Sequence, residues 1–156
     1  MRALVFSDTH SNNSLMLEAA GRFRPDVLIH LGDYERDAEI LRSAFPECAL
    51  YNVRGNCDIG GSAPDFDIVP LGPVKAFITH GHLYNVDYGH IYTLAYAAQE
   101  QGASIAMFGH THEALNDRFG SMYILNPGTA GRGRDLTFAI VEVFDNGAIS
   151  CEIRDL

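Results

Sequence analysis

The sequence predicts an α/β domain in which a largely parallel sheet is covered by helices. Short apolar runs alternate with helix-like stretches through the first half of the chain, as in parallel strands joined by helical crossovers. Short strands separated by turn signals follow in the last third and indicate antiparallel pairing there. A length of 156 residues is enough for one domain to bury a core without disulfides, so we expect a single domain over residues 1–156.

The first half is expected to contain three strands and two helices in alternation. Apolar residues recur at helical spacing after the first apolar run, and Pro25 stops that helix. A stretch rich in Gly, Ser and Pro, residues 59–65, predicts a surface loop. The predicted strands are 3–6, 27–31 and 48–53, and the predicted helices are 11–23 and 34–45.

The second half is expected to contain one helix and a larger number of short strands. Asp145-Asn146-Gly147 is a strong hairpin signal between the last two of them. The predicted helix is 88–102, and the predicted strands are 66–69, 74–79, 104–108, 114–119, 122–125, 137–143 and 148–153.

Composition excludes several classes of protein. A formal charge of -9 repels polyanions, which argues against a nucleic-acid binder. No stretch approaches the roughly 20 apolar residues of a membrane span, and the start lacks the apolar core of a signal peptide, so we expect a cytoplasmic protein without a membrane partner. The cysteines are odd in number and lack C-x-x-C spacing, which predicts reduced thiols.

Polar side chains follow several of the predicted strands. Asp8 and His10 point to the same side of an extended chain, although an Asp in that place is more often a turn former or a helix cap. The joint pattern is more informative, because the carboxyl edge of such a sheet is where α/β folds place ligands. Its mixed nitrogen and oxygen donors suit two borderline divalent ions such as Mn, Fe, Co, Ni or Zn. The residues are Asp8, His10, Asp33, Asn56, His80, His110 and His112.

The order of the motifs D-x-H, G-D, G-N-x-D, H-G-H and G-H-x-H, followed by Asn126-Pro127-Gly128, resembles the calcineurin-like metallophosphoesterase superfamily. The short length and the Gly-Asn-Cys-Asp variant are similar to its small prokaryotic phosphodiesterase branch. The resemblance implies a four-layer α-β-β-α sandwich of two mixed sheets flanked by helices, with a dinuclear metal site at the carboxyl ends of strands. It also implies a metal-dependent phosphodiesterase that hydrolyses a small phosphate ester by attack of a metal-bound hydroxide. Of the candidate ions, Mn is expected first.

The resemblance also implies a role for each motif residue. Asp8, His10 and His112 would hold the first metal, Asn56, His80 and His110 would hold the second, and Asp33 would bridge both. The catalytic set would be Asp33, Asn56, His80 and His82, with His82 either orienting the ligands or contacting substrate. Arg132 and Arg134 are either phosphate contacts or solvated loop residues, and Asp58 either orients a neighbour of Asn56 or ends a strand.

The chain departs from part of the superfamily at Cys57. Protein phosphatases and nucleases of this group have His there, which helps the leaving group depart, whereas a thiol is a poorer proton donor. Those two activities are therefore not transferred to this chain.

Two other functions compete with the enzyme. A non-catalytic scaffold like the retromer subunit of the same fold is one, but all seven ligand positions are filled, and keeping such polar clusters unpaired is costly. An amidohydrolase, suggested by His110-Thr111-His112, needs a barrel of about 250 residues, and this chain is too short. The sequence leaves the physiological substrate, the native metal and a homo-oligomeric state open.

Overall fold

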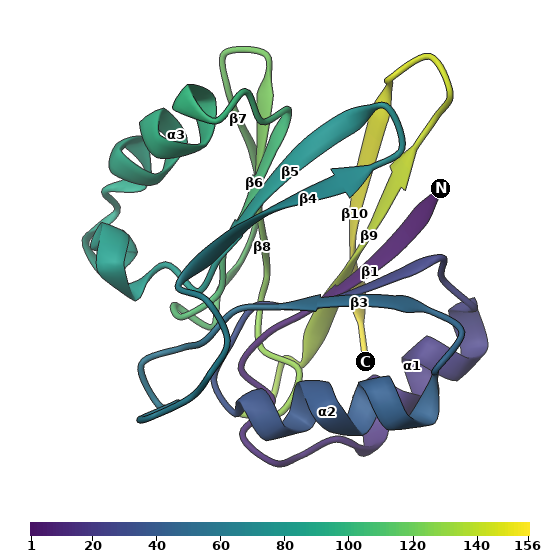
Figure 1. Ribbon diagram of the computed structural model, residues 1–156. Coiled ribbons are helices and arrows are strands. Elements are labelled where there is room, and N and C mark those ends of the chain that lie inside the picture. Colours follow the sequence, from purple (N-terminus) through teal and green to yellow (C-terminus); the bar gives the residue numbers. More distant parts are fainter.

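Two five-stranded sheets pack face to face between helices in the computed structural model, which describes residues 1–156 apart from the side chain of Tyr88 (Figure 1). The first sheet has the order β10-β9-β1-β2-β3 and the second has the order β4-β5-β6-β8-β7. The first two helices cover the outer face of the first sheet, and the third covers the outer face of the second (Figure 1). The expected four-layer sandwich of two mixed sheets is therefore confirmed.

The first sheet combines the two ends of the chain. Its parallel strands β1, β2 and β3 are joined by helical crossovers, as the alternating pattern predicts. The last two strands return to the free side of β1 and pair antiparallel. Its elements are β1 (Arg2–Phe6), α1 (Ser14–Phe23), β2 (Val27–His30), α2 (Glu35–Ala44), β3 (Ala49–Asn52), β9 (Thr137–Val143) and β10 (Ile149–Asp155).

The second sheet is built from the middle of the chain. Strands β5, β6 and β8 are parallel, and β4 and β7 form antiparallel edges. The expectation of antiparallel pairing near the carboxyl terminus is right for β7–β8 and β9–β10, but β8 also pairs parallel with β6. Its elements are β4 (Phe66–Leu71), β5 (Val74–Thr79), η1 (His82–Tyr84), η2 (Val86–Tyr88), α3 (Ile91–Glu100), β6 (Ile105–Met107), β7 (Ala114–Phe119) and β8 (Met122–Pro127).

Three apolar layers hold the four structural layers together. Alternation along β1 shows how one strand serves two of them: Val5 packs between the sheets, whereas Leu4 and Phe6 face the helices α1 and α2. Ile78 and Met107 of the second sheet join Val5 in the central layer. The third layer lies between the second sheet and α3.

The helices begin one to three residues later than the sequence predicts, and the backbone of the preceding loop explains the start of α1. Asp8, His10 and Ser11 have φ values of 55°, 46° and 67°, which no right-handed helix accommodates, so α1 starts at Ser14.

Strand β4 extends through Pro70, where a break is expected, because β4 is an edge strand and the missing N–H needs no partner there.

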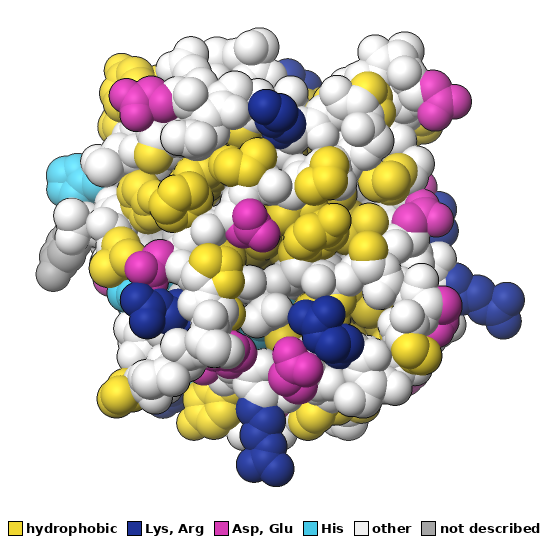
Figure 2. Space-filling view, in the orientation of Figure 1, with side chains coloured by type: hydrophobic (Ala, Val, Ile, Leu, Met, Phe, Trp, Pro, Cys, Tyr) yellow, Lys and Arg dark blue, Asp and Glu magenta, His cyan; other side chains and the backbone are white. Residues whose placement is uncertain are grey.

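On the face drawn in Figure 2, Lys and Arg side chains are scattered singly among acidic and apolar ones. Within the described residues, no helix is long and apolar enough to cross a bilayer.

Candidate metal centre

The loops that follow β1, β2 and β6 hold their polar residues in left-handed backbone. Asp8, His10, Asp33, His110 and His112 have φ values of 55°, 46°, 56°, 70° and 59°. Such conformations cost on the order of 1–3 kcal/mol each and cluster at functional sites, where the surrounding structure enforces them. The polar residues that follow three separate strands thus share one strained conformation.

Asp8 is a buried carboxylate with one oxygen unused. Its Oδ2 accepts hydrogen bonds from Ser7 Oγ at 2.5 Å and from the His110 backbone N–H at 3.1 Å. Its Oδ1 is buried without a hydrogen-bond partner among the described residues. Burial alone would raise the pKa of Asp8, but His112, His80 and Ser7 outweigh it and hold this pKa below its ordinary value. Asp8 is therefore an ionised group whose Oδ1, without a hydrogen bond, is in a position to bind a cation.

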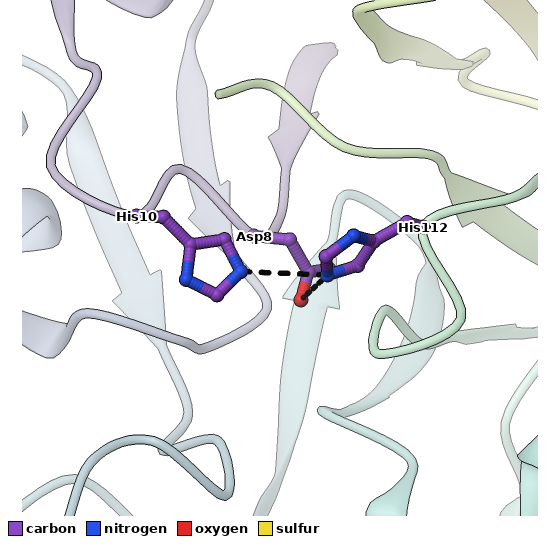
Figure 3. Close-up of side chains that lie close together, drawn as sticks. All are labelled: Asp8, His10 and His112. Atoms are coloured by element: carbon purple, nitrogen blue, oxygen red, sulfur yellow. Dashed lines mark hydrogen bonds and ion pairs between the residues drawn. The ribbon is translucent and has the colours of Figure 1, made fainter. Parts of the chain in front are cut away.

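His10 and His112 flank that oxygen (Figure 3). Nε2 of His112 lies 3.2 Å from Oδ1 of Asp8 and 3.4 Å from Nε2 of His10. Burial lowers the pKa of His10, whereas Asp8 raises the pKa of His112. Two ring nitrogens and a carboxylate oxygen thus converge on one point.

Asp33 faces this group and a second one at the same time. Its carboxylate is 3% exposed, with Oδ2 3.8 Å from Nε2 of His10 and Oδ1 3.4 Å from Nε2 of His80. The backbone N–H of Cys57 donates to Oδ1 at 2.9 Å. One carboxylate therefore lies between two clusters of donor atoms.

His80 anchors the second cluster. Its Nδ1 lies 2.7 Å from the carbonyl oxygen of Leu31, which in the neutral ring places the proton on Nδ1 and leaves Nε2 with a lone pair. That lone pair faces Oδ1 of Asn56 at 3.1 Å, besides the oxygen of Asp33. In the neutral ring these three atoms all present lone pairs, and a cation among them would stabilise that arrangement.

The spacing of these atoms fits metal coordination. Two ligand atoms about 2.1 Å from a tetrahedral ion are about 3.4 Å apart. The observed separations of 3.2 Å and 3.4 Å in the first cluster and 3.1 Å and 3.4 Å in the second agree with that value. Together with the Oδ1 of Asp8, which has no hydrogen bond, these separations suit the binding of divalent ions.

Two further predicted site residues lie beside His80. His110 belongs to none of the potential ligand groups found among the described residues, and its Nε2 lies 2.7 Å from Oδ2 of Asp87. Its ring centroid is still 5.0 Å from that of His80. His82 begins η1 with its ring centroid 5.4 Å from that of His80, and burial, His80 and His110 lower its pKa.

Several residues that sequence reasoning passed over or left undecided support the site. Asp58 accepts hydrogen bonds from the backbone N–H groups of Tyr34 and Glu35 with one oxygen and from that of Gly55 with the other, so it caps α2 and ties the Gly55–Asp58 loop to Asp33. Asn126 is fully buried and braces the loop at 109–111 through Gly109 O and Thr111 Oγ1. Both lay in recognisable motifs, Asp58 in G-N-x-D and Asn126 in Asn126-Pro127-Gly128.

Cys57 also joins the site. Its Sγ, with ligand atoms of His10 and Asp33, forms a third group that could hold an ion. Burial and the neighbouring Asp33 raise the pKa of the Cys57 thiol to about 11.

Arg132 is exposed, yet close enough that its charge helps to lower the pKa of His10 and offsets part of the rise in the pKa of His112. Its backbone N–H donates to Thr129 Oγ1, which in turn donates to the carbonyl oxygen of Asp8. The loop that carries Arg132 is therefore fixed against the first cluster. Arg134 is exposed two residues further along this loop.

Two glycines allow the loops to approach the carboxylates. A Cβ added at Gly109 would overlap Ser7 Oγ and crowd Oδ2 of Asp8. A Cβ added at Gly55 would overlap Oδ1 of Asp33. The glycines of G-N-x-D and G-H-x-H are therefore required by packing around Asp33 and Asp8.

Comparison with known proteins agrees with this geometry. The sequence pattern of the calcineurin-like phosphoesterase superfamily domain matches residues 1–146. A protein of Bacillus subtilis (strain 168), named a probable metallophosphoesterase, is 33% identical over 132 residues, which cover 83% of this chain and 75% of the relative. A phosphodiesterase of Methanocaldococcus jannaschii is 25% identical over 145 residues, covering 82% of this chain and 83% of the relative. The crystal structure of wild-type Vps29 of Entamoeba histolytica complexed with Zn²⁺ has a TM-score of 0.76 at 22% identity and covers 99% of each chain, which shows a shared fold.

Proposed function

Because this chain belongs to the calcineurin-like phosphoesterase superfamily, we propose that it is a metal-dependent phosphodiesterase acting on a small phosphate ester. The observation that carries the proposal is the position of Asp33, whose two oxygens face His10 and His80 separately. A single carboxylate shared by two donor clusters is what a dinuclear centre needs, because its negative charge offsets the repulsion between two cations.

The first cluster supplies ligands for one ion and the second for another. Asp8, His10 and His112 would hold the first, and His80 and Asn56 would hold the second, with Asp33 between them. When bound, a pair of divalent ions supplies a nucleophile at neutral pH by lowering the pKa of water, and it neutralises charge on the phosphate. These donors suit Mn, Ni, Co, Fe or Zn, and we expect Mn first.

The chain itself supplies position and charge. Asp8 and Asp33 are fixed by hydrogen bonds from Ser7 Oγ and from the Cys57 backbone N–H, so their free oxygens need no rearrangement to bind ions. With both carboxylates ionised, two dications and one hydroxide would leave a local charge near +1. That positive charge attracts the single negative charge of a phosphodiester, whereas the acidic chain as a whole repels polyanions.

A non-catalytic scaffold is the competing function, and the shared fold with Vps29 is the observation in its favour. The relatives named probable metallophosphoesterase and phosphodiesterase support the enzyme instead, since each matches more than four fifths of this chain at higher identity than that Vps29 does. The enzyme would hydrolyse phosphate esters, whereas the scaffold would not.

The deciding experiment measures hydrolysis by metal-stripped protein with Mn, Ni, Co, Zn and Mg added back singly. We expect bis(p-nitrophenyl) phosphate to be hydrolysed in preference to p-nitrophenyl phosphate. Asp33→Asn should nearly abolish turnover and lower metal content, because a neutral amide cannot offset the repulsion between cations. Asp117→Asn on exposed β7 is the matched control and should keep both. Absence of turnover with every metal would favour the scaffold, and two bound ions with full activity in Asp33→Asn would rule out the bridging role.

A further inference from the structure

Asp87 contacts a predicted metal ligand from outside the donor clusters. Its Oδ2 lies 2.7 Å from Nε2 of His110, and the two side chains are 49% and 17% exposed. Imidazole has two ring nitrogens, so a contact at Nε2 leaves only Nδ1 for any other partner. The superfamily motif G-H-x-H says nothing about which nitrogen is used, and Asp87 belongs to none of the motifs.

We propose that Asp87 is a positioning residue that holds His110 with Nδ1 available to the second metal ion. Asp87 accepts the hydrogen bond from the Nε2–H of His110, which fixes the ring tautomer and orientation. A carboxylate in this place also raises the basicity of the other ring nitrogen, and metal-bound histidines commonly have such a partner. The inference rests on the proposed dinuclear site. It adds Asp87 as the residue that positions His110 as a ligand of the second ion.

The backbone around both partners is anchored to the site. Val86, which precedes Asp87, is 4% exposed and packs in the apolar layer that also contains Phe108. Its Cγ2 lies so close to Gly81 that a Cβ there would come within 2.9 Å. The short helix that carries Asp87 is therefore packed against the H-G-H segment.

The other partner is tied to the first cluster. The backbone N–H of His110 donates to Oδ2 of Asp8 at 3.1 Å, and the N–H of Gly109 donates to the carbonyl oxygen of His80 at 2.9 Å. The His110 ring also packs 5.0 Å from the His80 ring, measured between centroids. The backbone N–H and the Nε2 of His110 are both engaged, so Nδ1 is the ring nitrogen that remains available to bind an ion.

The test measures metal binding by metal-free protein, independently of turnover. Mn²⁺ is titrated calorimetrically into the unaltered chain and into Asp87→Ala, Asp87→Asn and His110→Ala, with Asp117→Ala as the matched surface control. We expect Asp87→Ala to weaken one of two ions by about 10- to 100-fold and to leave the other within about twofold. Asp87→Asn should lie between, because its amide oxygen still accepts the Nε2–H.

A double variant separates positioning from general stability. If Asp87 acts through His110, adding Asp87→Ala to His110→Ala should weaken the second ion no further. Two ions bound with unaltered affinities in Asp87→Ala would overturn the inference, as would equal weakening of both ions together with a lower melting temperature. Fewer than two ions bound to the unaltered chain would contradict the proposed dinuclear site itself, a result distinguishable from any effect of Asp87.

Discussion

The hydroxyl of Thr9 donates a 2.6 Å hydrogen bond to the buried carboxylate of Asp37. The same hydroxyl oxygen lies 3.1 Å from Nε2 of His30, whose Nδ1 accepts a hydrogen bond from the backbone N–H of Gly32. Because Nδ1 accepts a hydrogen bond, the proton of the neutral His30 ring lies on Nε2, which donates a hydrogen bond to the Thr9 hydroxyl oxygen. Because Thr9 lies between Asp8 and His10, and Gly32 precedes Asp33, this buried chain joins the two loops that supply both donor clusters.

Replacing Thr9 tests that connection. Thr9→Val keeps the shape of the side chain but removes a partner from Asp37 and from His30, which should lower the free energy of unfolding by about 1–3 kcal/mol. It should also weaken metal binding, because the loops lose their link. Thr9→Ser, which restores the hydroxyl, should recover both properties. Calorimetric metal titration and thermal unfolding of the two variants check this. Equal metal affinity and equal stability of Thr9→Val and Thr9→Ser would show that the hydroxyl is dispensable.

Gly109 tests the close packing around Asp8. In Gly109→Ala the new Cβ overlaps Ser7 Oγ, which donates to Asp8, so overpacking should cost about 1–3 kcal/mol of unfolding free energy and reduce metal affinity. Gly21→Ala is the control, because its Cβ would meet only Phe45 at ordinary contact distance inside α1. That variant should be neutral or more stable by up to about 1 kcal/mol. Denaturant unfolding of both proteins decides the point, and equal stability would argue against packing as the reason for Gly109.

Local patterns in the sequence predict most elements and most site residues. The apolar run before Asp8, and the runs before Asp33 and His80, identify three strand ends that do meet. His30, inside β2, is fully buried and both of its ring nitrogens are engaged. These predictions depend on a few neighbouring residues, which is why periodicity and spacing carry them.

Long-range partners could not be predicted in this way. Periodicity does not reveal that β9 returns to pair with β1, because antiparallel strands carry the same alternation whichever sheet they join. Asp37 and Asp87 look like ordinary polar residues of helical segments. Their roles depend on Thr9 and His110, 28 and 23 residues away in the chain, contacts that no local pattern records.

The cysteines should be poorly reactive despite the exposure of Cys57. Burial and Asp33 raise the pKa of the Cys57 thiol to about 11, and burial raises that of Cys151 to about 12. At pH 8 a thiol with a pKa of about 11 is about 0.1% thiolate and one with a pKa of about 12 is about 0.01% thiolate, on the order of a hundredfold or more below an ordinary cysteine. Alkylation of metal-free protein by iodoacetamide should therefore be slow at pH 8 and accelerate about tenfold per pH unit. The urea-unfolded chain is the control, and equally fast alkylation of the folded protein would contradict the raised pKa.

Cys57 should also make turnover depend strongly on the leaving group. A departing alkoxide needs a proton, and a positioned acid typically contributes about 10²- to 10⁴-fold. The thiol of Cys57 lies beside Asp33 with a pKa of about 11, so it holds its proton firmly and is a weak hydrogen-bond donor. We therefore expect kcat/KM across aryl phosphodiesters of graded leaving-group pKa to fall steeply for the unaltered chain and less steeply for Cys57→His, which gains a proton donor. Cys57→Ala should keep the steep dependence, because it removes a group that contributes little. Equal, shallow dependences in all three proteins would assign proton donation to another residue, and His82, whose ring lies 5.4 Å from that of His80, would be the next to replace.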